Sequence, residues 1–183
     1  VDVVQGPIES ITREEVMTAI KAMKAGKAAG VSEVVAEHID ASGEVGIDVI
    51  TEMANRVLDG KGIPDDWRHS VLVPLYKGKG DVRDCGAYRG VKLLEHGMKI
   101  VERVFERRLR EVVEIDEMQC GFMPGKGTVD AFFMTRVLQE RYLRKKKRLY
   151  MCFVDLGKAF DRVPRKVIER ALRKKGVNER LVG

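Results

Sequence analysis

Hydrophobic residues recur at helical spacing in several stretches of the chain and predict most of its secondary structure. The spacing predicts helices over about 12–25, 33–40, 46–59, 93–113 and 129–145, and a further helix from about Pro164 to Gly176. At the first of these, Thr12 and Glu15 have the spacing of a capping box. Asn178 is a candidate cap for a helix near the end of the sequence.

Two stretches rich in β-branched and aromatic residues instead predict strands. The first is SVLVPLY (70–76), in which Pro74 indicates an edge strand or a bulge. The second is LYMCFVDL (149–156), a buried central strand that carries Asp155 near its end. An aspartate there either ends the strand at a turn or places a carboxylate where chemistry can occur, and the pattern alone leaves both open. The order of elements predicts an α+β fold, with Trp67 as a packing anchor.

Composition narrows the class of protein. The chain has 183 residues, of which 44% are hydrophobic and 34% are charged, as in a globular domain or part of one. No apolar run approaches the roughly 18 residues of a membrane helix, so we expect no membrane partner. The cysteines, Cys85, Cys120 and Cys152, are scattered and form no CxxC pair, which indicates neither a disulfide framework nor a zinc site.

The charge distribution favours an anionic partner, with nucleic acid first. The formal net charge is +6. One run holds six cations and no acid, namely Arg141, Arg144, Lys145, Lys146, Lys147 and Arg148. This run is either a solvated helix end whose cations suit the helix dipole, or a surface that contacts phosphates.

Two glycine-rich loops also contain lysines. KGKGD (77–81) can wrap a polyphosphate or can simply be a hairpin tip. MQCGFMPGKGT (118–128) precedes a helix for which Thr128 is the expected N-cap. A nucleotide-binding P-loop is disfavoured there, because three residues rather than four separate Gly121 from Gly125, and Gly127 follows Lys126.

Six blocks occur in one order along the chain and are specific together. They are KAMKAGKAAG (21–30), IPDDW (63–67), VLVPLYKGK (71–79), YRGVKLLEHGMK (88–99), QCGFMPGKGTVDA (119–131) and FVDLGKAFDRVPR (153–165). This set resembles the reverse transcriptase domain of non-LTR (LINE-type) retrotransposons. The resemblance implies the fingers and partial palm of a right-hand polymerase fold, helix-rich with a small antiparallel sheet. Residues 1–148 would be the fingers-like region with the first palm elements, and 149–183 the truncated start of the palm with the first catalytic motif.

The same resemblance implies a catalytic site around the last block. Asp155 would be the catalytic carboxylate that bridges two Mg²⁺ ions, with the backbone carbonyl of Leu156 as a further metal ligand. Phe160 would exclude ribonucleotides by a clash at the sugar 2′-position, and Ala159 would lie beside the incoming sugar. Asp161 is expected to be structural.

Other blocks imply the nucleotide-binding residues. Arg89 matches the arginine that clamps the triphosphate, and Lys77 or Lys79 matches its lysine partner. Gln119 and Gly121 match a block that lines the nucleotide and template region. The basic run from Arg141 would then face the nucleic-acid backbone.

Departures from the family pattern limit the expected activity. Ala29, Val31 and Ser32 replace a Pro-Gly-Pro-Asp turn, which predicts a looser first loop. No aromatic-x-Asp-Asp motif follows Asp155 within the 183 residues, and Asp65–Asp66 lies in a different block. We therefore expect a fragment of a polymerase that is inactive alone.

The leading hypothesis is RNA-directed DNA synthesis in a parent protein. Its partners would be template RNA, a DNA primer, dNTPs and Mg²⁺, with the remaining palm, a thumb and an optional endonuclease domain elsewhere in the parent. By family alone, the location would be intracellular, in the cytoplasm as a ribonucleoprotein and in the nucleus at integration. The alternatives are a non-catalytic nucleic-acid-binding remnant or domesticated module, and a phosphate-binding NTPase, which the loop spacing disfavours.

Overall fold

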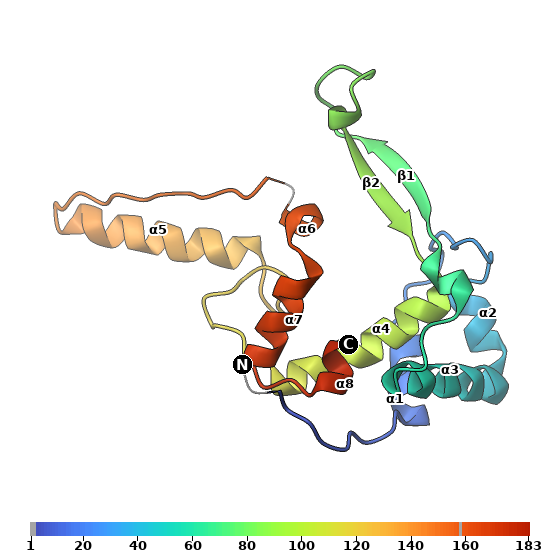
Figure 1. The fold of residues 1–183 in the computed structure, drawn as a ribbon. Helices are drawn as coiled ribbons and strands as arrows, with labels where there is room; N and C mark the ends of the chain where they lie inside the picture. The colour runs from blue at the N-terminus through green and yellow to red at the C-terminus, as the bar shows by residue number, and fades with distance from the viewer. Residues whose placement is uncertain (1–2, 158) are drawn as a thin grey trace. The chain divides into compact units, whose positions relative to one another are not determined.

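The structure is a computed structural model that describes residues 3–157 and 159–183, without the side chains of 160 and 161. The chain forms two compact units, residues 1–113 with 169–183, and residues 114–168. The elements, labelled in Figure 1, are α1 (Arg13–Lys21), α2 (Ala36–Ala41), α3 (Gly43–Leu58), η1 (Asp65–Arg68), β1 (Val71–Tyr76), η2 (Cys85–Ala87), β2 (Tyr88–Leu93), α4 (His96–Val112), α5 (Thr128–Arg144), α6 (Ala159–Arg162), α7 (Arg165–Lys174) and α8 (Glu179–Val182). The predicted α+β class is confirmed in this helix-rich form with a two-stranded antiparallel sheet.

The core of the first unit lies between α1, α3 and α4, with α2 beside them. Apolar residues spaced three or four apart on these helices are buried against one another, including Val16, Ala54 and Ile100, whose exposure is 0%. Trp67 packs against the edge of this core, which confirms it as a packing anchor. The predicted capping box is also present, because the Thr12 amide donates to Glu15 Oε2 and the Glu15 amide donates to Thr12 Oγ1.

The loop between α1 and α2 is hydrogen-bonded to the start of α4. That it is looser than the corresponding loop of the family stays a prediction. Glu95 accepts hydrogen bonds from the amide and hydroxyl of Ser32. The buried ring of His96 bonds at Nδ1 to the Ala36 amide (2.8 Å) and at Nε2 to the Ala28 carbonyl (3.0 Å). A Cβ on Gly30 would lie 2.5 Å from the Glu95 carboxylate, so glycine is required by the close approach. These contacts hold the loop against the first turn of α4.

The predicted strand 70–76 is β1, and it pairs with β2, which periodicity did not predict. The register sets Val73 opposite Val91 and Leu75 opposite Arg89, in antiparallel order. Pro74 is tolerated because each strand of a two-stranded sheet is an edge strand. The helix predicted from residue 93 begins only at His96, because Leu93 still belongs to β2.

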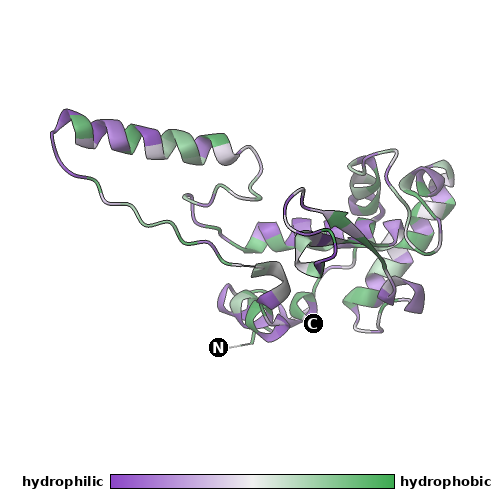
Figure 2. Cartoon of the chain, turned by 90° about the horizontal axis from the view of Figure 1, so that it is seen from above, coloured by the Kyte–Doolittle hydropathy of each residue, from purple (hydrophilic) through white to green (hydrophobic). Residues whose placement is uncertain are grey.

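In the second unit, the predicted central strand 149–156 is not a strand. No β-ladder forms at these positions, and Phe153, Val154 and Leu156 are each at least 71% exposed. A strand needs a neighbour to complete its backbone hydrogen bonds, and no described residue provides one here. Figure 2 shows hydrophobic residues along α5 as well, and α5 has no buried residue.

The ends of the described chain meet in the first unit. Asn178 caps α8 by accepting from the Arg180 amide, as predicted, and its side chain donates to the Gly6 carbonyl. The Glu179 amide donates to the Val4 carbonyl at 3.0 Å. Gly176 has a φ of +75° just after α7, which fits its predicted place at the end of that helix.

Candidate nucleotide- and nucleic-acid-binding site

The tip of the β1–β2 hairpin is an ordered turn. Gly78 and Gly80 have φ values of +75° and +90°, which the glycine-rich sequence permits. The hydroxyl of Tyr76 donates to the Gly80 carbonyl and that of Tyr88 to the Val82 carbonyl, at 2.7 and 2.8 Å. The two rings pack with centroids 5.5 Å apart. The tip is therefore held by its own contacts while its cations stay near solvent.

The strand register separates the two candidate lysines. The Lys77 amide donates to the Ala87 carbonyl, which continues the ladder one residue beyond Tyr76. Side chains alternate between faces along a strand, so Lys77 shares a face with Leu75 and hence with Arg89 opposite it. Lys77 Nζ also donates to the Gly86 carbonyl at 2.7 Å. Lys79 lies in the turn, is exposed, and has no hydrogen-bond or ion-pair partner among the described residues.

The second glycine-rich loop brings Gln119 and Gly121 together. The Gln119 side-chain amide donates to the Gly121 carbonyl at 3.1 Å. Helix α5 begins at Thr128, so the N-cap is Gly127 and the prediction of Thr128 was one residue off. The Gly127 amide donates to the Asp130 carboxylate at 2.7 Å. An acid thus occupies this helix start, which further disfavours an NTPase-like phosphate site there.

The basic run forms the end of α5 and the turn that follows. All six of its cations are exposed, and none forms an ion pair with a described residue. Lys145 is the C-cap, and Lys146 adopts a left-handed φ of 50°. The run therefore both suits the negative helix end and leaves its cations available to an anion.

Asp155 lies in the extended segment that leads to α6. It is exposed, and no described residue bonds to its carboxylate. Leu156 follows in the same extended chain, and Ala159 begins α6. The Phe160 and Asp161 side chains, predicted as a sugar gate and a structural acid, lie outside the described residues.

The oxygen donors around Asp155 meet only part of what magnesium requires. Mg²⁺ favours hard oxygen ligands in an octahedral set completed by water and substrate phosphate. One carboxylate and the Leu156 carbonyl are suitable donors for one ion. They are too few for a pair, and the described residues hold no cluster of three or more acidic, histidine or cysteine side chains.

The predicted site residues are thus distributed over both units. The hairpin of the first unit carries Lys77, Lys79 and Arg89, whereas the second unit carries the Gln119–Gly121 loop, the basic run and Asp155.

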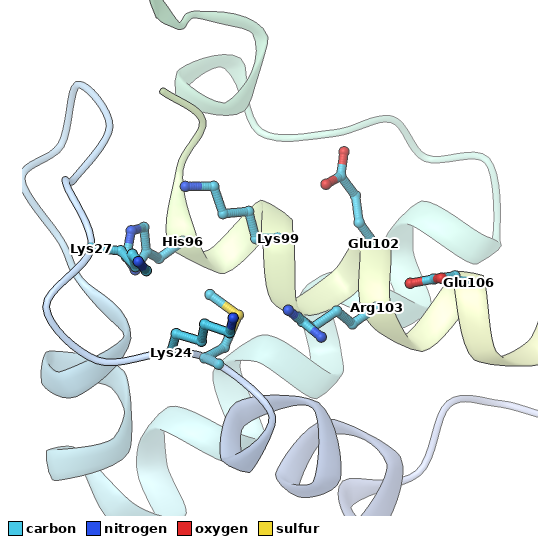
Figure 3. A pocket seen from close by; sticks show the side chains of 8 residues that line it. Lys24, Lys27, His96, Lys99, Glu102, Arg103 and Glu106 are labelled. Carbon is cyan, nitrogen blue, oxygen red and sulfur yellow. The ribbon is translucent and has the colours of Figure 1, made fainter. Parts of the chain in front are cut away.

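A basic pocket of the first unit was not predicted from the sequence. It has a volume of about 440 Å³ and is lined by Met23, Lys24, Lys27, His96, Lys99, Glu102, Arg103 and Glu106 (Figure 3). The i,i+4 spacing of Lys99 and Arg103 was a readable signal, but only the folded loop brings Lys24 and Lys27 to the same place. None of the described helices has the length and apolar character needed to cross a membrane.

Comparison with known proteins defines the class. Residues 77–182 match the family model described as "Reverse transcriptase (RNA-dependent DNA polymerase)". The match covers both glycine-rich loops, 77–81 at the hairpin tip and 118–128 before α5, and also the segment that contains Asp155. The chain belongs to this reverse transcriptase family.

Similar curated proteins come from mobile elements. The "Probable RNA-directed DNA polymerase from transposon BS" of Drosophila melanogaster is 26% identical over 86% of this chain and 18% of its own length. The "Transposon TX1 uncharacterized 149 kDa protein" of Xenopus laevis is 30% identical over 94% of the chain and 13% of its own length. The Pol polyprotein of the type-1 retrotransposable element R2 of Popillia japonica is 26% identical over 64% and 16%. The predicted relationship to non-LTR retrotransposon reverse transcriptases is confirmed, and the chain spans less than a fifth of each relative.

Proposed function

We propose that the parent of this chain carries out RNA-directed DNA synthesis, and that residues 1–148 and 149–183 supply its fingers and the start of its palm. The observation that carries this proposal is the shared face of Lys77 and Arg89 on the hairpin, two residues that both lie within the family match. A guanidinium and an ammonium on one face can neutralise the oxygens of a nucleoside triphosphate. The Lys77 side chain is held by its hydrogen bond to the Gly86 carbonyl, so we favour Lys77 over Lys79 as the partner of Arg89.

In the second unit, Asp155 and the Leu156 carbonyl would hold a magnesium ion. The ion would supply charge stabilisation of the phosphoryl oxygens as a new phosphodiester bond forms. Gln119 and Gly121 would line the nucleotide and template, Ala159 would lie beside the sugar, and Phe160 would exclude ribonucleotides. The basic run from Arg141 would hold the phosphates of the template RNA or the DNA primer.

Other parts of the parent would complete this site. A two-metal reaction needs carboxylates beyond Asp155, which a further palm segment would supply. A thumb, and in some parents an endonuclease domain, would contact the same nucleic acids. The implied location is the cytoplasm as a ribonucleoprotein and the nucleus at integration.

Primer extension on a template RNA with dNTPs and Mg²⁺ tests the proposal. In a full-length parent, Asp155→Asn should abolish extension, with a loss of at least about a thousandfold, because the metal ligand is lost. Asp48→Asn is the matched control, since Asp48 is an exposed carboxylate that pairs with Arg13 in the first unit. The 183-residue chain alone should not extend a primer. Extension by the Asp155→Asn parent would refute the role of Asp155.

A second candidate function is nucleic-acid binding without catalysis. The observation that favours it is the set of six exposed cations in the basic run, none paired with a described residue. It predicts salt-sensitive binding of RNA by the full-length parent with no extension of a primer. Extension that depends on Asp155 would exclude it.

A further inference from the structure

The basic pocket of the first unit has two walls that are hydrogen-bonded to each other. One wall is the loop after α1, which carries Lys24 and Lys27, and the other is the first part of α4, which carries Lys99 and Arg103. His96 joins the walls, because its ring bonds to the Ala28 carbonyl of the loop. The backbone segments that carry the four cations are therefore held together by the fold.

The charges of the pocket are unbalanced. Figure 3 shows the ammonium groups of Lys24, Lys27 and Lys99 and the guanidinium of Arg103 around one space, and none of them forms an ion pair with a described residue. Lys99 and Arg103 are like charges at i,i+4, a spacing that destabilises a helix by a few tenths of a kcal/mol. An anion in this space would remove that repulsion.

Two acids in the lining only partly offset the cations. Glu106 is already bonded to Arg110 at 2.8 Å. Desolvation raises the pKa of Glu102, and the nearby Lys99 ammonium opposes that shift. Glu102 lies three residues after Lys99 on α4 and lines the same pocket, so its carboxylate competes with a bound anion for Lys99. The carboxylate points away from Lys24 (Figure 3).

We propose that this pocket binds consecutive backbone phosphates of a single nucleic-acid strand. Several cations spread over an open cavity of about 440 Å³ suit a chain of single charges better than one compact anion. The choice of a strand over another polyanion rests on the proposed polymerase function. The site uses none of the residues of the hairpin tip or of the Asp155 segment.

Equilibrium binding of a fluorescent single-stranded oligonucleotide to the 183-residue chain tests the proposal, without metal or dNTPs. Each phosphate contact on a single strand contributes a salt slope of about −0.7, or roughly fivefold in affinity between 0.1 M and 1 M salt. Lys27→Gln with Lys99→Gln should therefore weaken binding about 25-fold at 0.1 M salt and reduce the slope by about 1.4. Lys61→Gln with Arg170→Gln removes two exposed cations outside the pocket and should change both values much less.

Glu102→Gln provides a test of opposite sign that does not depend on a loss of function. It removes the acid that competes for Lys99, so it should strengthen oligonucleotide binding about twofold to fivefold at 0.1 M salt. Glu102→Gln also tests whether the pocket binds the strand if the double lysine variant fails to fold. Unchanged binding in Glu102→Gln, or equal losses in the pocket and control double variants, would overturn the proposal.

Competition identifies the anion. Displacement of the oligonucleotide by unlabelled RNA or DNA at far lower phosphate concentration than by inorganic tripolyphosphate is expected for a strand site. Equal competition per phosphate would show a site for free polyphosphate and would overturn the assignment to a strand. Because the assay contains no dNTPs or metal, its outcome is independent of whether the parent extends a primer.

Discussion

At the scale of single residues, Arg89 offers the sharpest test of the hairpin face. In a full-length parent, Arg89→Ala should raise the KM for dNTPs roughly tenfold or more, because a charge-assisted hydrogen bond contributes about 1.5–3 kcal/mol. Steady-state primer extension at varied dNTP concentration measures this. Lys92→Ala is the matched control, since Lys92 is a cation of the same strand on the opposite face, across from Leu72.

The comparison of these two variants also tests the register. If Lys92→Ala raised the KM as much as Arg89→Ala, general positive charge and not the Lys77–Arg89 face would bind the triphosphate. An unchanged KM in Arg89→Ala would remove Arg89 from the site.

At the scale of elements, one ion pair ties α1 to α4. Arg108 donates to both carboxylate oxygens of Glu15 at 2.7 and 2.8 Å, and also to the carbonyls of Glu9 and Ser10. Both side chains are mostly buried, with exposures of 13% and 23%. The hydrogen bond from Arg108 is the largest cause that holds the pKa of Glu15 below its ordinary value.

Arg108→Gln should therefore lower the free energy of unfolding by about 2–3 kcal/mol at pH 7, as measured by urea denaturation. A folded-state pKa below the unfolded one gives stability that is present at neutral pH and lost as the pH falls through the folded pKa. The difference between the unsubstituted chain and Arg108→Gln should thus shrink as the pH falls below the ordinary glutamate pKa of about 4.3.

The matched control is Arg107→Gln on the same helix. Arg107 pairs with Glu111 at 4.0 Å, and both side chains are at least 60% exposed, so its loss should cost well under 1 kcal/mol. A pH-independent difference for Arg108→Gln would show that packing of the arginine, and not its charge pair, holds the two helices.

Helices and caps that are determined by residues close together in the chain were predictable from the sequence. The apolar spacing on α3 and α4 and the Thr12–Glu15 cap act within a few residues of each other, and these features are present in the structure. β2 was missed because Gly90 interrupts any alternation, and this segment becomes a strand only by pairing with β1. Segment 149–156 has the composition of a strand but no described pairing partner. The prediction of a strand there was wrong because it rested on strand propensity alone.

The residues of the candidate site also fall into two groups, those that the sequence alone suggested and those that only the folded structure brings together. The family resemblance proposed Arg89 and Asp155 without any geometry. The choice of Lys77 over Lys79 required the strand register, and the basic pocket required the docking of the Gly30–Ser32 loop on Glu95. The contacts that dock this loop join residues more than sixty positions apart, which no local pattern encodes.

At the scale of the whole molecule, segment 149–156 exposes apolar side chains that another chain could cover. Tyr150, Phe153 and Val154 are 80–81% exposed in extended backbone whose hydrogen-bonding groups no β-ladder satisfies. Such a segment is a template for pairing with the same segment of another chain. We therefore expect the isolated 183-residue chain to self-associate through it.

Val154→Lys should reduce this association, because a charge on an exposed strand-like segment opposes edge pairing. Sedimentation velocity across a range of concentrations should show a larger monomer fraction, and the thermal unfolding midpoint of the first unit should not fall, since Val154 contributes to no core. Val82→Lys, at a residue 60% exposed in the hairpin turn, is the control and should leave association unchanged. If both variants reduced association equally, net charge and not the 149–156 segment would be the cause, and the segment would have no special role in bringing chains together.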